Sequence, residues 1–221
     1  MPQFNRVWQA NEFKVLPVDP ATLQPDAFLE DAGVTPGAEF IAWGPEASLA
    51  YASYGIWLKD SPAPTTSGIG GFFAFGQPTP SSGIPASGVS VFTGTIRGFF
   101  FDAFVTGNFA QFEANVVISA NFATRQLTLA TNGTTIFLPN GFTVGRADLN
   151  CLGSATWDSS GQLTGNMSAP GVGAGSYMGS LRGALYGPRA QETAVVFSLT
   201  RHGTVSNDSA YLVGGWAAKG S

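Results

Sequence analysis

The sequence predicts an all-β protein, an antiparallel up-and-down β-barrel of about eight strands preceded by a small β-rich or irregular N-terminal region. From Ala50 onward, short β-branched and aromatic runs are separated by Gly, Pro, Asn and Ser, which is typical of strands joined by turns. Residues 112–122 alternate apolar and mostly polar side chains with the period of a half-buried strand. Glycines recur inside the runs, where they permit the coiling that a small barrel requires: Gly94, Gly98, Gly165, Gly179 and Gly183.

The N-terminal residues, 1–48, differ from the rest of the chain. They are rich in Pro, Asp and Glu and show little alternation, and Pro25 interrupts the one stretch that resembles a helix. We therefore expect an irregular N-terminal arm with short helical turns over 1–48, a β-rich segment leading into the barrel over 49–87, and the antiparallel barrel over 88–221.

The expected strands all end at turn residues and cover 51–58, 70–76, 88–98, 99–107, 112–122, 125–137, 147–157, 162–169, 176–187, 193–200 and 210–218. Asn132-Gly133 is a candidate two-residue hairpin turn, because both residues tolerate positive φ. Residues 158–162 should close Trp157 onto Leu163. Short turns make sequential strands antiparallel neighbours, and closing the sheet removes its exposed edges.

Composition excludes several classes of function. The 221 residues are 44% hydrophobic and only 11% charged, against roughly 25% charged in average soluble domains. The net charge is −4 and the basic residues are dispersed, so we expect no nucleic-acid partner. No apolar run is long enough for a transmembrane segment. The N-terminus lacks a signal peptide, so Met1 is either an intracellular start or, as we favour, follows a removed targeting segment.

Catalytic and metal-binding patterns are missing from the sequence. Cys151 has no second cysteine to pair with and is interpreted as a small buried hydrophobe. His202 is the sole histidine, so a histidine cluster for zinc is excluded. The carboxylates are scattered over separate strands and turns and do not indicate a catalytic pair. We expect no enzyme activity, no catalytic residues and no metal site.

The segment "SYMGSLRGALYGPRAQETAVVFSL", residues 176–199, combines an apolar strand, a Gly187-Pro188 turn and a second apolar strand. Glu192 can accept hydrogen bonds from backbone donors of the turn, or pair with Arg189 or Arg182. The alternative is that Arg189 and Glu192 contact a ligand, because loops at a barrel mouth often carry binding residues.

The same segment resembles the transferrin-binding-protein-like β-barrel (solute-binding) domain of bacterial surface and secreted proteins. Members carry G-x-F-Y-G-P-x-A-x-E-x-G-G, which stands here as residues 183–195, with Leu185 for the aromatic residue and Ala194-Val195 for Gly-Gly. "GIPASGVSVFTGTIRG" at 83–98 is similar to the opening barrel strand, and "YLVGGWAAKG" at 211–220 to the closing one. The resemblance covers the chain from about residue 50 onward.

The resemblance implies a non-enzymatic binding protein, extracellular or on the outer-membrane surface, whose signal or lipid anchor has been removed. It would capture a solute, haem among them, or a protein partner, and an outer-membrane receptor is a further candidate partner. The candidate ligand-binding residues are Tyr186, Arg189, Glu192 and His202. Histidine commonly holds haem iron, although His202 lies in a polar stretch where solvation explains it equally. The candidate mouth loops are 61–68, 77–87, 139–145, 170–175 and 203–209.

An aromatic cluster at Phe99, Phe100, Phe101 and Phe104 gives the alternative function. Consecutive strand residues point to opposite faces, so Phe100, or Phe99 and Phe101, must face away from the barrel interior. We expect the N-terminal arm to cover that face. Otherwise the four residues form a partner patch, and the protein is a structural or adhesive envelope module that self-associates or binds an envelope component.

Overall fold

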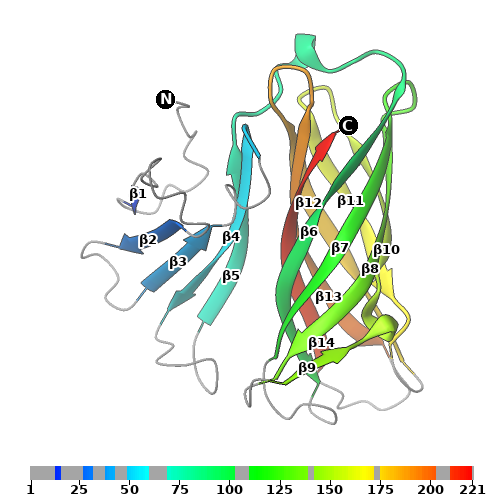
Figure 1. Cartoon of the computed structure of the whole chain (residues 1–221). Coiled ribbons are helices and arrows are strands. Elements are labelled where there is room, and N and C mark those ends of the chain that lie inside the picture. The colour runs from blue at the N-terminus through cyan, green and yellow to red at the C-terminus, as the bar shows by residue number, and fades with distance from the viewer. Residues whose placement is uncertain are drawn as a thin grey trace.

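The structure is a computed structural model that describes residues 13–15, 27–31, 38–42, 49–59, 69–102, 110–138, 142–171, 175–202 and 210–220. Its strands form two separate antiparallel sheets, a five-stranded N-terminal sheet and a closed barrel beside it (Figure 1). None of the helices in these ranges has the length and hydropathy of a membrane span.

The N-terminal sheet is a meander in which each strand pairs with the next along the chain. Its strands are β1 (Phe13–Val15), β2 (Ala27–Asp31), β3 (Ala38–Ala42), β4 (Ala52–Lys59) and β5 (Ile69–Gly76). β4 and β5 are the strands nearest the barrel (Figure 1).

The barrel is an up-and-down arrangement of eight long strands, as the sequence predicts. They are β6 (Val89–Asp102), β7 (Ala110–Asn121), β8 (Gln126–Phe137), β10 (Leu152–Trp157), β11 (Gln162–Ala169), β12 (Ser176–Tyr186), β13 (Glu192–His202) and β14 (Ala210–Gly220). Pairing of β10 with β8 and of β14 with β6 closes the ring. A short strand, β9 (Thr143–Gly145), adds to β8, and two 3₁₀ turns, η2 (Ser81–Gly83) and η3 (Ala147–Leu149), lie in the connections.

The barrel interior is filled by side chains. Alternate residues of every long strand point inward, and β7 alternates buried and solvent-facing positions along its length. Aromatic rings span the interior: Phe197 has its ring centroid 6.4 Å from that of Phe112 and 5.9 Å from that of Trp216. Phe122 packs edge-on against Trp157 at 5.5 Å. The barrel is therefore a packed core rather than an open channel.

Interior glycines let neighbouring strands approach closely, as expected. A β-carbon at Gly98 would overlap the carbonyl oxygen of Val213, and one at Gly179 would overlap that of Ser198. Any other residue at these positions would push the neighbouring strand away, so these glycines set the curvature of the wall.

The expectation of an irregular arm with helical turns over 1–48 is wrong where the structure describes that region, because β1, β2 and β3 are strands. Residues 27–30 pair with 39–42, and β3 in turn pairs with β4. Backbone pairing with a stronger neighbouring strand compensates for the weak local pattern.

Two strand boundaries also differ from the prediction. We expected two strands, at 88–98 and 99–107. The structure has one continuous strand there, β6, because Gly98 pairs with both β14 and β7. Asn132-Gly133 does not form a hairpin. β8 continues through it with a β-bulge, since Asn115 pairs with Asn132 whereas Glu113 pairs with Thr135. Gly133 has a φ of 67°, which a bulge accommodates. The turn that closes Trp157 onto Leu163 is confirmed.

The connections leave the barrel at two opposite ends. Segment 77–87 precedes β6 and lies at the same end as the β12–β13 turn, whereas β8, β11 and β13, the strands that precede candidate loops 139–145, 170–175 and 203–209, end at the opposite end. Residues 61–68 and 203–209 lie outside the described residues. The candidate loops therefore do not form one mouth. His202, expected in a polar loop, has its backbone in β13, paired with Ser176; its side chain lies outside the described residues.

Candidate functional site

Glu192 connects the barrel to the N-terminal sheet. We call this contact, between residues 50–54 and the β12–β13 turn with its flanking residues, the joint. The Glu192 side chain is fully buried at the start of β13. The carboxylate accepts hydrogen bonds from the backbone N–H groups of Ala50 at 2.7 Å, Tyr51 at 2.8 Å and Ala52 at 2.7 Å. Three consecutive N–H groups directed at one carboxylate compensate for its removal from water. Sequence reasoning expected backbone donors from the local turn, but the donors lie about 140 residues earlier, at the start of β4.

The Tyr186-Gly187-Pro188 turn belongs to the same joint. Gly187 has a φ of 84° and donates its N–H to the carbonyl of Gln77 at 2.9 Å. Pro78 forms an isolated bridge with Tyr186, and the Thr79 N–H bonds to the Leu185 carbonyl at 3.0 Å. Residues 77–79, which lie in the segment that links the two sheets, are therefore hydrogen-bonded to the end of β12 and the turn after it.

Small apolar residues complete the joint. Ala184, Ala194 and Ala217 lie on the outer face of neighbouring barrel strands and are buried in one cluster with Ala52 and Tyr54 of β4. Farther along, Phe72 of β5 contacts Phe99 of β6 with ring centroids 6.0 Å apart. Short side chains on the barrel wall allow β4 and β5 to lie close to it.

The structure separates the predicted site residues. Tyr186 is buried in the joint, and burial raises the pKa of its hydroxyl to about 12. Arg189 is exposed, and its backbone N–H bonds to the Gln191 side chain at 2.8 Å. The ligand-binding role of Tyr186, Arg189, Glu192 and His202 stays a prediction, although the burial of Tyr186 and Glu192 argues against direct contact with a ligand.

The predicted partner patch is wrong for Phe100, which is buried inside the barrel and packs edge-on against Tyr177 at 6.1 Å. Phe99 faces outward and contacts Phe72 of β5. Most of the N-terminal arm that was expected to cover this face lies outside the described residues. The Phe101 side chain and all of Phe104 lie outside the described residues.

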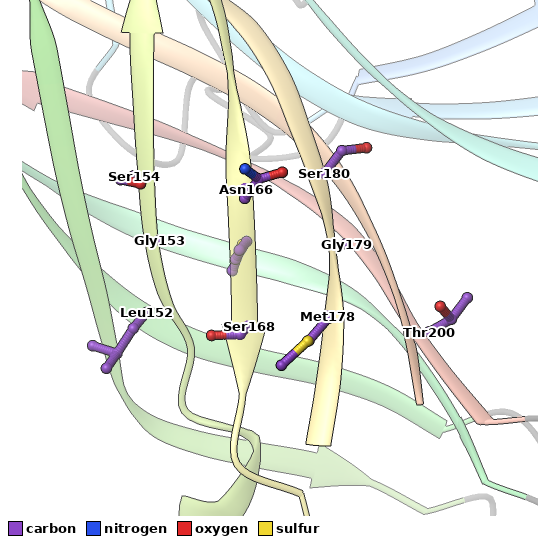
Figure 2. Close-up of a pocket in the computed structure, with 10 residues that line it drawn as sticks. Leu152, Gly153, Ser154, Asn166, Ser168, Met178, Gly179, Ser180 and Thr200 are labelled. Atoms are coloured by element: carbon purple, nitrogen blue, oxygen red, sulfur yellow. The ribbon is translucent and has the colours of Figure 1, made fainter. Parts of the chain in front are cut away.

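A groove on the outer wall of the barrel was not indicated by any sequence motif. It has a volume of about 810 Å³ and is lined by residues of four neighbouring strands, β10 to β13 (Figure 2). Ser154, Asn166 and Ser180 are register partners across β10, β11 and β12. The next row toward the strand ends contains Leu152, Ser168, Met178 and Thr200.

The groove offers neutral hydrogen-bonding groups beside an apolar rim. All its lining residues are uncharged. Met178 is 51% exposed and Leu152 is 63% exposed, and the two flank Ser168. Such a surface suits a partner that supplies apolar contacts and neutral hydrogen bonds rather than a highly charged ligand. It lies toward the barrel end at which β8, β11 and β13 end.

The groups that could bind metal, and the free thiol, are as follows in the described part of the chain. No three His, Cys, Asp or Glu side chains there are grouped as metal ligands would be. Cys151 is a free, buried thiol, as predicted, and burial raises its pKa to about 12. A protonated thiol at neutral pH is a poor nucleophile.

Solved structures share this two-sheet architecture. Transferrin binding protein B from Haemophilus parasuis Hp5 matches with a TM-score of 0.60 over 96% of this chain, at 16% identity. The isotype 1 protein from serogroup B Neisseria meningitidis matches with a TM-score of 0.60 over 93% of this chain, at 15% identity. The chain has the fold of transferrin binding protein B.

The match to transferrin binding protein B confirms the fold that the resemblance of residues 183–195 implied. This chain spans 39% of the Haemophilus parasuis chain and 37% of the Neisseria meningitidis chain. No family model matches the chain, and no curated protein matches its sequence.

Proposed function

We propose that the chain is a non-enzymatic binding protein of the bacterial cell surface or exterior, and that it holds a protein partner on the outside of its barrel. Transferrin binding protein B has this fold and is named for binding transferrin. By this likeness we assign the present chain to the class of protein-binding proteins, without naming its partner.

The packed interior is the observation that supports a binding surface on the outside of the barrel. Phe100, Phe197 and Trp216 fill the space that a lipid or haem carrier would keep for its ligand. Small-molecule sites enclose most of the ligand surface, whereas the groove of β10 to β13 is open to solvent. A protein can cover that groove together with the adjoining barrel end, and we assign the binding surface to both.

The experiment measures binding of immobilised chain to extracellular proteins by interferometry, beginning with iron-loaded and iron-free transferrin. Met178→Arg places a long charged side chain in the groove and should weaken binding about tenfold, equivalent to about 1.4 kcal/mol. Thr93→Arg on β6, also exposed and separated from β10 by β7 and β8, is the matched control and should bind as the parent protein does.

Two results would overturn the proposal. One is a protein partner whose affinity is unchanged by Met178→Arg, because the groove would then lie outside the interface. The other is stoichiometric uptake of haem, seen as a shifted Soret band, without binding of any protein; that result would support the solute-binding form with His202 as the first iron ligand to test.

The structural or adhesive alternative has lost part of its support. It depended on an exposed phenylalanine patch, but Phe100 is inside the barrel and Phe99 packs against Phe72. Light scattering at high concentration tests it, because self-association would raise the measured mass.

A further inference from the structure

We infer that Glu192 is a charge-dependent latch: its carboxylate holds the N-terminal sheet on the barrel, and neutralising it releases that sheet while the barrel stays folded. The inference concerns the joint between the two sheets and is independent of the partner.

The latch is a direct polar connection between the start of β4 and the barrel wall. The two sheets are separate and share no strand ladder. One carboxylate, fully buried, receives all three N–H groups of residues 50–52 at 2.7–2.8 Å. Hydrogen bonds to an ionised acceptor are about twice as strong as neutral ones, so the negative charge strengthens this joint.

The position of the hinge follows from the connecting segment. Thr79 donates to the Leu185 carbonyl at 3.0 Å, and the Gln77 carbonyl accepts from Gly187 at 2.9 Å, so this segment is fixed to the barrel. One further backbone bond, from Gln77 N–H to the Tyr51 carbonyl at 2.8 Å, reaches the N-terminal sheet. Release would therefore separate residues 49–76 from a connector that stays in place.

On the barrel side the apolar part of the joint combines three small side chains with two aromatic ones, Tyr186 and Phe99. Apart from Tyr186, the barrel residues of the cluster are Ala184, Ala194 and Ala217. An alanine side chain buries little apolar area, so each contributes only a small part of the hydrophobic stabilisation. The hydrogen bonds of the Glu192 carboxylate therefore act beside the aromatic contacts in keeping the sheet docked.

The barrel does not depend on this carboxylate for its own core. The interior cluster is formed by residues such as Phe92, Leu181 and Trp216, and Glu192 lies outside it. The strand pairing of β13 uses the Glu192 backbone, which a side-chain substitution leaves intact.

The isosteric variant Glu192→Gln isolates the charge. A carboxylate presents two acceptor oxygens, whereas a carboxamide presents one acceptor and an NH₂ donor. The donor must then face at least one of the three backbone N–H groups, which loses its acceptor while buried. Glu192→Asp keeps the charge on a shorter side chain and should give an intermediate effect.

Hydrogen exchange of the full chain, followed by mass spectrometry, tests the latch. In Glu192→Gln, peptides from 50–59 and 69–76 should exchange about tenfold to a hundredfold faster, as expected when one or two hydrogen bonds to a charged group are lost. Peptides from β6, β7 and β14 should keep their protection. Glu113→Gln is the matched control, because Glu113 forms an exposed ion pair with Arg97 at 2.9 Å on the barrel surface; it should leave 50–76 unchanged.

Three outcomes would overturn the inference: unchanged exchange of 50–76 in Glu192→Gln, loss of protection in the barrel strands together with 50–76, or an equal effect of Glu113→Gln. Should Glu192→Gln fail to fold, exchange of the parent protein at rising urea concentrations decides. If Glu192 is a latch, the exchange of residues 50–59 and 69–76 should depend less steeply on urea than the exchange of the barrel strands. The same urea dependence for both sheets would mean that they unfold together, which contradicts the latch.

Discussion

Gly187 and Tyr51 are in such close contact that a β-carbon at position 187 would stand 2.6 Å from Cδ2 of the tyrosine ring. The same glycine has a φ of 84°. Gly187→Val would thus combine backbone strain with a clash at the joint, and we expect the free energy of unfolding to fall by about 1–3 kcal/mol. Urea denaturation monitored by tryptophan fluorescence measures the change.

Arg189→Ala is the companion to that variant, since Arg189 is two residues away in the same turn but exposed. Its unfolding free energy should stay within about 0.5 kcal/mol of the parent value. If Arg189 contacts the partner, its loss should weaken binding about tenfold with the stability unchanged. An Arg189→Ala protein as unstable as Gly187→Val would contradict both roles.

Phe99 and Phe100 should respond very differently to truncation, because only Phe100 lies in the barrel core. Phe100→Ala should lower the unfolding free energy by about 3–5 kcal/mol, the usual cost of removing a buried aromatic ring. Phe99→Ala removes one contact with Phe72 and should cost roughly 1–2 kcal/mol. Equal losses in denaturant titrations would mean that the two side chains have similar environments.

Cys151 should be protected from thiol reagents in the folded protein. Burial raises its pKa from 9.0 to about 12, an effect that a hydrogen bond with Thr131 only partly offsets. At pH 8 an aromatic disulfide reagent should react only after denaturation. Between pH 9 and 12 the folded state holds this proton more tightly than the unfolded state, so stability should fall as the pH rises. Cys151→Ala should lessen that fall; rapid labelling of native protein would disprove the buried position.

Asp148 makes a paired contact with Arg146, whose Nε and Nη2 donate to its two carboxylate oxygens at 2.8 and 2.7 Å. Desolvation alone would raise the Asp148 pKa, but the hydrogen bonds and charge of Arg146 hold it below its usual 3.8. The stabilisation is present above the unfolded-state pKa and is lost as the pH falls through the folded-state value. Asp148→Asn should therefore be less stable than the parent at pH 7 and show a shallower loss on acidification, as urea titrations at pH 7 and 3 would reveal.

The barrel could be predicted from the sequence because the patterns that specify it involve residues close together in the chain. Alternation in β7 fixes which side chains enter the core, and short turns such as that between Trp157 and Leu163 make neighbours antiparallel. The interpretation of Asn132-Gly133 as a hairpin was wrong for a related reason: a residue pair that tolerates positive φ serves a bulge as well as a turn.

The joint could not be predicted because its contacts are far apart in the chain. The Gly-Pro-x-Ala-x-Glu motif indicated that Glu192 mattered, yet nothing near it identifies Ala52 as a donor. β2 and β3 were missed because their stability comes from strand pairing, of β2 with β3 and of β3 with β4, rather than from their own composition. The groove has no motif, since small polar residues are common on every exposed strand face.

The pairing of β14 with β6 determines when the barrel can close during synthesis. Gly215 lies opposite Arg97, so the ring closes only after nearly every residue of the barrel has left the ribosome. The first five strands are synthesised long before Glu192, and until then their docking surface does not exist. Assembly should proceed as a growing open sheet whose closing seam is also the slowest step of barrel formation, because it joins the first and the last strand of the barrel. A nascent chain lacking β14 would leave both β6 and β13 with unpaired edges and would be the species most dependent on chaperones.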